Sequence, residues 1–139
     1  MFKHEITYTD FNDIERKEDF YFHLSTPEVI RLEAEIGGEI QAYTERIAKE
    51  QNLTELLDFM EKLILGSYGK KTLDGKSFIK NKDLRVEFEY SQAYAEMFEE
   101  MIKNPDLARR FGEGVAEAAK HRKKKNTFEP RVVEDTTPE

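Results

Sequence analysis

Cysteine and tryptophan are both absent from the 139 residues, and proline occurs only four times. Without cysteine, the chain can form no disulfide, no thiolate nucleophile and no cysteine-ligated metal site, which suits a reducing cytoplasm. No apolar run approaches the roughly 18 residues that a membrane-spanning helix needs. The first residues also lack the apolar core of a secretion signal. We therefore expect a cytoplasmic protein that has no membrane partner.

Charge is what the chain has in excess. Charged residues make up 37% of the sequence, against about 25% in an average globular protein, and the formal net charge is −7. Residues 120–139 hold six basic and four acidic side chains, a net charge of +2, which leaves −9 for residues 1–119. Because an acidic body repels nucleic-acid phosphates and attracts basic protein surfaces, we expect protein partners and no nucleic acid.

The first 24 residues contain two stretches, 2–9 and 17–24, in which apolar and polar side chains alternate. This period of two is typical of half-buried β-strands. Between the stretches lie Asn12 and Asp13, two residue types that tolerate the left-handed backbone of a tight turn. The pattern predicts a β-hairpin over residues 2–24. Since an isolated hairpin is marginally stable, its apolar face must pack on the rest of the protein.

From residue 26 onward, apolar side chains recur at the three- and four-residue steps of amphipathic helices. A loop or short ribbon is expected over 70–81, where Asp74-Gly75 is a turn signal. The fold class that follows is mainly α, with the N-terminal β-hairpin packed on a bundle of about five or six short helices. Helix starts are predicted by capping residues at Ser25, Asn52, Asn81, Ser91 and Asn104.

The domain organisation predicted is one compact domain over residues 1–119, with the hairpin at 2–24 and helices at 26–119. Residues 120–139 have a different composition, in which a basic run is followed by a stretch with two prolines and little periodicity. Such a segment cannot bury enough apolar surface to offset the entropy of ordering it. We expect a disordered, flexible charged tail there.

Catalytic motifs are missing: the sequence contains no HExxH, GxSxG, GxxxxGKS or GxGxxG pattern. His4 and His23 could approach each other across the hairpin, but a zinc site takes three or four protein ligands. His121 lies in the basic run, which would repel a cation. We therefore predict no enzyme, no catalytic residue, no metal and no cofactor. A hydrolase with a spatially assembled pair of carboxylates stays open as a third hypothesis.

The candidate functional residues are side chains suited to contact with another protein. One group is a stripe of methionine and aromatic residues in the helix after Ser91, because methionine adapts to varied surfaces. The ordinary interpretation of such a stripe is core packing, and that of the basic run is a solvated tail. The predicted partner-binding residues are Tyr94, Met97, Phe98, Met101, Lys123, Lys124 and Lys125.

Three blocks of the sequence resemble the tail assembly chaperones of long-tailed, siphovirus-type phages of Gram-positive bacteria. The first block runs over 6–25 and begins Ile6-Thr7-Tyr8-Thr9-Asp10-Phe11-Asn12. The second includes Ser67-Tyr68-Gly69 and Asp74-Gly75-Lys76, and the third is Ser91-Gln92-Ala93-Tyr94 with Met97-Phe98. The order and spacing of the blocks, which cover about residues 5–115, carry the resemblance. Asp13 departs from the family, which often has glycine there.

The resemblance implies that the protein acts in tail assembly and does not catalyse a reaction. Such chaperones bind the long, aggregation-prone tape measure protein, help to recruit the major tail tube protein around it, and then leave. Many are made in two lengths by a programmed ribosomal frameshift. For this chain, from a phage or prophage, the resemblance implies the host bacterial cytoplasm and absence from the mature virion. We also expect a homo-oligomer, since one-sided apolar stripes on short helices often need a neighbour.

The alternative interpretation is an acidic regulatory module, such as an inhibitor or antitoxin, that binds a basic protein. It is motivated by the charge of −9 on residues 1–119. Salt dependence distinguishes the two roles, because electrostatic binding weakens steeply as salt rises and apolar holding does not.

Overall fold

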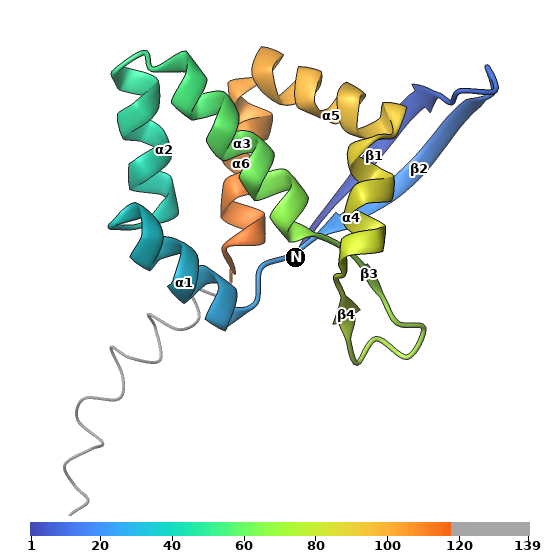
Figure 1. Cartoon of the computed structure of the whole chain (residues 1–139), viewed down its shortest axis with the longest axis horizontal. Helices are drawn as coiled ribbons and strands as arrows, with labels where there is room; N and C mark the ends of the chain where they lie inside the picture. The colour runs from blue at the N-terminus through green and yellow to red at the C-terminus, as the bar shows by residue number, and fades with distance from the viewer. Residues whose placement is uncertain (118–139) are drawn as a thin grey trace, which may run out of the picture.

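An antiparallel four-stranded sheet and six helices make up residues 1–117, the part of the chain that the computed structural model describes (Figure 1). The predicted fold class, a mainly helical protein with an N-terminal β-hairpin, is confirmed. The predicted tail at 120–139 lies outside the described residues. The strands, in the order in which they lie in the sheet, are β1 (Phe2–Thr9), β2 (Glu15–Phe22), β3 (Tyr68–Lys71) and β4 (Phe78–Ile79).

The predicted hairpin consists of β1 and β2, which pair from Phe2 opposite Phe22 to Thr9 opposite Glu15. Asp13 adopts the left-handed backbone expected of the turn, with a φ of 61°. The second strand ends two residues earlier than the predicted 17–24, because the chain changes partner at its end. The backbone N–H of His23 donates to Ser67 O, and that of Leu24 donates to Val115 O.

The predicted ribbon at 70–81 is confirmed as β3 and β4, but its place in the fold was not foreseen. Strand β3 pairs with β2, at Tyr21 opposite Gly69 and Phe22 opposite Tyr68. The ribbon therefore extends the N-terminal sheet. A Cβ atom on Gly69 would lie 2.6 Å from the carbonyl oxygen of Ile79, so the close approach of β4 requires glycine at this position.

All five predicted capping residues start helices. The side chain of each accepts a hydrogen bond from the backbone N–H three residues later, and Ser25 forms the full capping box with Glu28. Each cap satisfies a donor that a helix start leaves without a partner, which stabilises the helix by about 1 kcal/mol. The helices are α1 (Thr26–Ile36), α2 (Ile40–Lys49), α3 (Leu53–Ser67), α4 (Lys82–Glu89), α5 (Gln92–Lys103) and α6 (Pro105–Val115).

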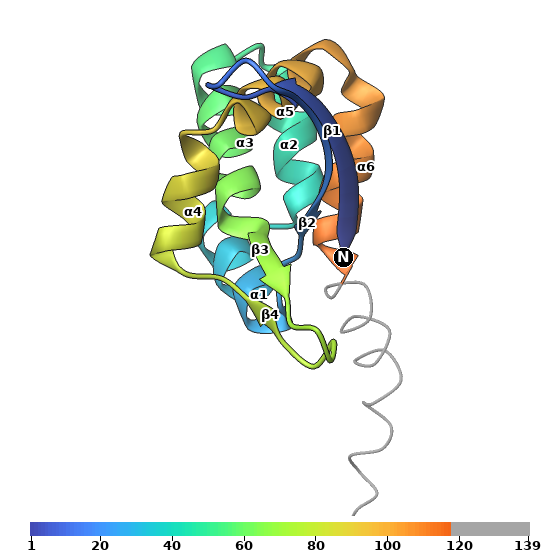
Figure 2. The same ribbon diagram turned by 90° about the vertical axis from the view of Figure 1, so that its right-hand side faces the viewer.

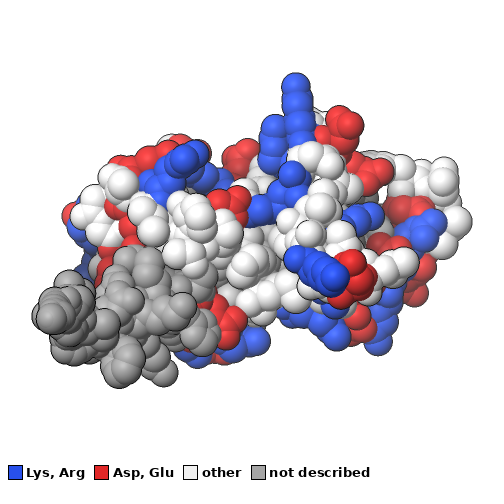
Figure 3. All heavy atoms as spheres, turned by 90° about the horizontal axis from the view of Figure 1, so that it is seen from below, with Lys and Arg blue, Asp and Glu red and all other residues white. Residues whose placement is uncertain are grey.

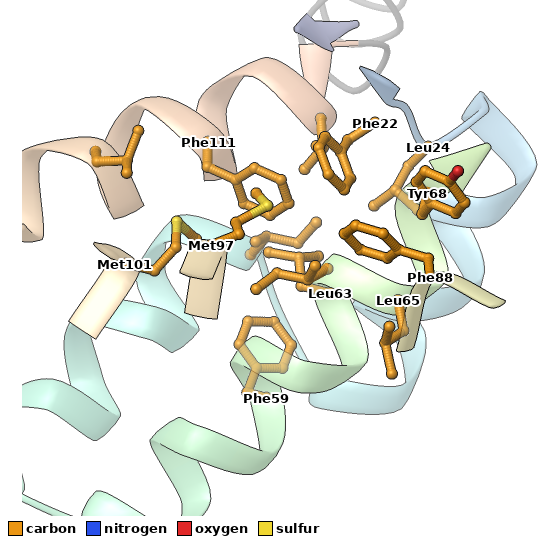
Figure 4. Close-up of a cluster of buried hydrophobic side chains, with 14 of the residues drawn as sticks. Phe22, Leu24, Phe59, Leu63, Leu65, Tyr68, Phe88, Met97, Met101 and Phe111 are labelled. Carbon is orange, nitrogen blue, oxygen red and sulfur yellow. The ribbon is translucent and has the colours of Figure 1, made fainter. Parts of the chain in front are cut away.

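The core lies where the base of the hairpin meets the helices, and Figure 2 shows β1 and β2 curving along one side of them. Phe22, which is 0% exposed, lies 5.9, 5.8 and 5.4 Å from the ring centroids of Tyr68, Phe88 and Phe111 (Figure 4). These rings come from β2, β3, α4 and α6. Three segments far apart in the sequence, β3, α4 and α6, therefore hold the base of the hairpin in place.

Lys80 joins the base of the hairpin to two helices. Its Nζ donates to His23 O at 2.9 Å, to Gly66 O at 3.0 Å and to Glu28 Oε1 at 2.6 Å. Glu28 also accepts a hydrogen bond from the backbone N–H of Ser25 at 2.8 Å. Burial alone would raise the pKa of Glu28, but the hydrogen bonds from Lys80 and Ser25 outweigh it and hold the pKa below its ordinary value.

Candidate protein-binding surfaces

The predicted partner-binding residues on α5 divide into a buried row and a more exposed row. Met97 and Met101 are 0% and 4% exposed and pack in the protein's own core (Figure 4). Tyr94 and Phe98 lie partly exposed at the margin of that core, and one turn further Ile102 is 50% exposed. Residues four apart share one side of a helix. We call this row, Tyr94, Phe98 and Ile102, the α5 stripe.

The α5 stripe continues the aromatic core out to the surface. The Tyr94 ring centroid lies 5.6 Å from that of Phe88 and 5.7 Å from that of Phe98. Burial raises the pKa of Tyr94 to about 12, and the nearby carboxylates of Glu61 and Glu89 contribute to the shift. The stripe is therefore an apolar line with acidic side chains beside it.

The other predicted partner-binding residues, Lys123, Lys124 and Lys125, lie outside the described residues.

The turn of the β1–β2 hairpin carries two exposed apolar side chains, Phe11 at 74% and Ile14 at 51%. We call residues 10–14 the hairpin tip. It extends past the N-terminal end of α5 (Figure 1). Asp10 orders the tip, since its Oδ1 accepts from the backbone N–H of Asn12 at 2.8 Å and of Ile14 at 3.0 Å. Its Oδ2 accepts from Arg16 Nε at 2.6 Å.

The Arg16 guanidinium holds the pKa of Asp10 below its usual range, with the two backbone hydrogen bonds adding to the effect. Asp10 is therefore charged at neutral pH, when it orders the tip. An aromatic side chain on an ordered turn loses little entropy when a partner covers it, which suits a contact residue.

Sequence reasoning did not identify Phe11 or Leu73 as contact residues. Leu73 is 109% exposed at the turn between β3 and β4. In both cases a large apolar residue lies among turn residues, where polar side chains are expected. That mismatch is the signal that could have found them.

Charge is segregated in the described structure. The segment 68–82, which we call the basic ribbon, holds five lysines and one aspartate, a net charge of +4. The described residues together contain 16 basic and 25 acidic side chains, a net charge of −9, so those outside the ribbon carry −13. Figure 3, the view from below, shows uncharged surface bordered by Lys and Arg as well as by Asp and Glu side chains.

An open depression of about 660 Å³ lies beside the basic ribbon, and its lining includes Lys71, Lys76, Lys80 and His23. Burial, followed by the positive charges of the N-terminal amine and Lys80, lowers the pKa of His23. The other strand histidine, His4, has its Nε2 3.0 Å from Glu100 Oε1.

Within residues 1–117, no group of three or more His, Asp or Glu side chains is placed to hold a metal ion. No helix in this part of the chain has the length and apolar character needed to cross a membrane.

The fold and these surfaces define a small acidic protein that presents apolar side chains on a helix, a hairpin tip and a ribbon. A family model described as phage tail assembly chaperone matches residues 1–137. The chain belongs to this family, which confirms the resemblance at the level of the family. Comparisons with curated proteins and with solved structures found no match.

Proposed function

We propose that the protein holds the tape measure protein of a siphovirus-type phage or prophage of a Gram-positive bacterium and helps to recruit the major tail tube protein. It does so in the host cytoplasm and leaves before the virion is complete. Membership of the tail assembly chaperone family supports the general role. The observation that carries the specific proposal is the α5 stripe.

The α5 stripe suits an amphipathic helix of the client. Tyr94, Phe98 and Ile102 line two turns of one helix, which matches the spacing of apolar side chains on a partner helix. Met97 and Met101 are buried on the same helix. Because methionine is flexible and polarizable, their side chains can adjust when a client helix binds. Acidic neighbours such as Glu61 keep the surface hydrated when no client is bound.

The basic run at Lys123, Lys124 and Lys125 is proposed to contact the tube protein. Its charge is opposite to that of the described residues, which carry −9. A separate basic segment therefore suits a second, acidic partner better than it suits the same client.

The test is co-expression with the tape measure protein, read as the fraction of that client that stays in solution. The wild-type chain is expected to raise this fraction. Ile102→Asp places a charge at the exposed end of the α5 stripe and is expected to weaken client binding by about tenfold. Ile30→Asp on α1 is the matched control, because Ile30 is 47% exposed and Ile102 is 50% exposed.

The proposal would be contradicted if the wild-type chain did not raise the soluble fraction of the client. Equal effects of Ile102→Asp and Ile30→Asp on client binding would show that the α5 stripe is not the client-binding surface. Steep loss of the complex with rising salt would favour the acidic regulatory module instead.

A further inference from the structure

The depression beside the basic ribbon has a cationic lining. Lys71, Lys76 and Lys80 all line it, and Glu28 is the one acidic side chain that lines it within residues 1–117. Glu28 is already bound by Lys80, whose Nζ lies 2.6 Å from its Oε1. The charges of Lys71 and Lys76 are therefore left uncompensated in the lining.

Lysines without a carboxylate partner are concentrated in the basic ribbon. Within residues 1–117, Lys70, Lys76 and Lys82 form no ion pair, and Lys71 Nζ lies instead 4.7 Å from the ring centroid of Tyr21. Elsewhere in this part of the chain most lysines are paired with a carboxylate, as are Lys3, Lys17, Lys62 and Lys103. The ribbon thus holds positive charge that the protein's own fold does not use.

The turn of the ribbon is ordered by hydrogen bonds within itself. Asp74 Oδ1 accepts from the Thr72 hydroxyl at 2.7 Å and from the backbone N–H of Lys76 at 3.0 Å. The backbone N–H of Thr72 donates to Ser77 O at 2.9 Å. Leu73, 109% exposed, projects from this turn. Because an ordered turn loses little conformational entropy on binding, its leucine and its lysines are positioned for a partner in advance.

The side chains around the depression define the ligand by charge and polarity. Lys71 and Lys76 can each hold a carboxylate, and Leu73 and the half-buried ring of Phe78 offer apolar surface near them. An extended acidic protein segment, with an apolar side chain between its carboxylates, complements both features. A nucleic acid fits less well, because the described residues carry −9 in all and +4 in the ribbon, which leaves −13 elsewhere to repel a long run of phosphates.

We infer that this depression binds an acidic segment of another protein, whose carboxylates are held by Lys71 and Lys76 and whose apolar side chain packs against Leu73 and Phe78. The site is separate from the α5 stripe, since Figures 1 and 2 both place β4 at the lower end of the molecule and α5 at the upper end. One molecule can therefore hold the acidic segment and a client helix at the same time. Only this last consequence rests on the proposed function.

The test is an NMR titration of the purified full-length chain with a blocked peptide that has glutamates on both sides of one leucine. The backbone amides of Gly75, Lys76 and Ser77 are expected to shift, with a dissociation constant on the order of 1 mM or below in low salt. Raising salt from about 0.05 M to about 0.3 M is expected to weaken binding by about threefold or more. A peptide with glutamine in place of glutamate should bind about tenfold more weakly, because it brings no charge to the lysines.

Matched variants show whether the depression or the overall charge attracts the peptide. Lys71→Gln with Lys76→Gln is expected to weaken peptide binding by about tenfold. The control, Lys17→Gln with Lys49→Gln, removes the same charge from exposed lysines outside the ribbon and should bind within about twofold of wild type. Leu73→Ser, which keeps the charge and removes the apolar contact, should weaken binding by about threefold.

A peptide that shifts no amide of the ribbon would overturn the inference. Equal losses in the two double variants, both melting like wild type, would overturn it too, because the attraction would then be general. So would tighter binding of a single-stranded oligonucleotide of equal charge. Binding that appears only after Glu134→Gln with Asp135→Asn would assign the depression to the chain's own acidic residues and not to a second protein. None of these outcomes bears on client binding, because no client is present.

Discussion

The base and the tip of the β1–β2 hairpin use the same residue type in opposite ways. At the base, Phe22 is 0% exposed and packs against three rings from other parts of the chain. At the tip, Phe11 is 74% exposed on a turn that is ordered by local hydrogen bonds to Asp10. The base therefore stabilises the fold, and the tip is free to contact a partner.

The largest expected effect tests the base of the hairpin. Phe22→Ala should lower the free energy of unfolding by about 4 kcal/mol, because it leaves a cavity where four segments meet. Chemical denaturation measures this change, and Phe11→Ala at the tip is the matched control, expected to stay within about 0.5 kcal/mol of wild type. If Phe22→Ala does not fold, Phe22→Leu gives a smaller loss on the same scale. Similar losses at base and tip would contradict the comparison.

The next effect concerns Lys80, which joins the base of the hairpin to α1 and α3. Lys80→Met should lower the free energy of unfolding by about 2 kcal/mol, since two carbonyl oxygens and the Glu28 carboxylate lose a charged donor. Lys76→Met, which removes an exposed lysine from the same ribbon, is the control for the lost charge. The role assigned to Lys80 fails if the two variants are equally stable.

A smaller effect depends on pH. Because burial lowers the pKa of His23 from its ordinary 6.5, the unfolded chain takes up this proton first as the pH falls. The stability from neutral His23 is complete above about pH 6.5 and is lost as pH falls through the folded-state pKa. His23→Phe should therefore lose less stability than wild type between about pH 7 and pH 5, measured by denaturation at both. Identical pH profiles would refute this role.

The Glu28 carboxylate adds a second loss at lower pH. Its folded-state pKa lies below 4.5, so its contribution is complete above that value and disappears as the pH falls through the folded-state pKa.

The smallest global effect is expected at the tip. Asp10→Ala should change the free energy of unfolding by less than about 1 kcal/mol, because the hydrogen bonds that it removes are local and exposed. The backbone N–H groups of Asn12 and Ile14 should nevertheless exchange with solvent faster, since Asp10 is their acceptor. Amide exchange followed by NMR measures this, with Thr7 in β1 as an internal reference. Unchanged exchange at both residues would show that the tip is ordered by other contacts.

Local patterns predicted most of the secondary structure. Period-two alternation placed the hairpin, and all five capping residues start helices, because both signals involve residues close together in the chain. The pairing of β3 with β2 was not predicted. Strand partners so far apart in sequence are chosen by packing, which alternation does not reveal.

The candidate site shows the same limit. Spacing identified Tyr94, Met97, Phe98 and Met101 as one stripe, but not which of them would face the core. That depended on β1 and α6, which pack against α5 and bury the two methionines. Phe11 and Leu73 were missed because exposure cannot be inferred from residue type alone.

By itself, the sequence determined most of the elements, five of the helix starts, the excess of charge and the family resemblance. These depend on neighbours within a few residues or on the order of short blocks. Only the tertiary structure decided which apolar side chains stay exposed and where the basic ribbon lies relative to the α5 stripe. Exposure and distance depend on how segments far apart in the chain pack together, and no local pattern encodes that.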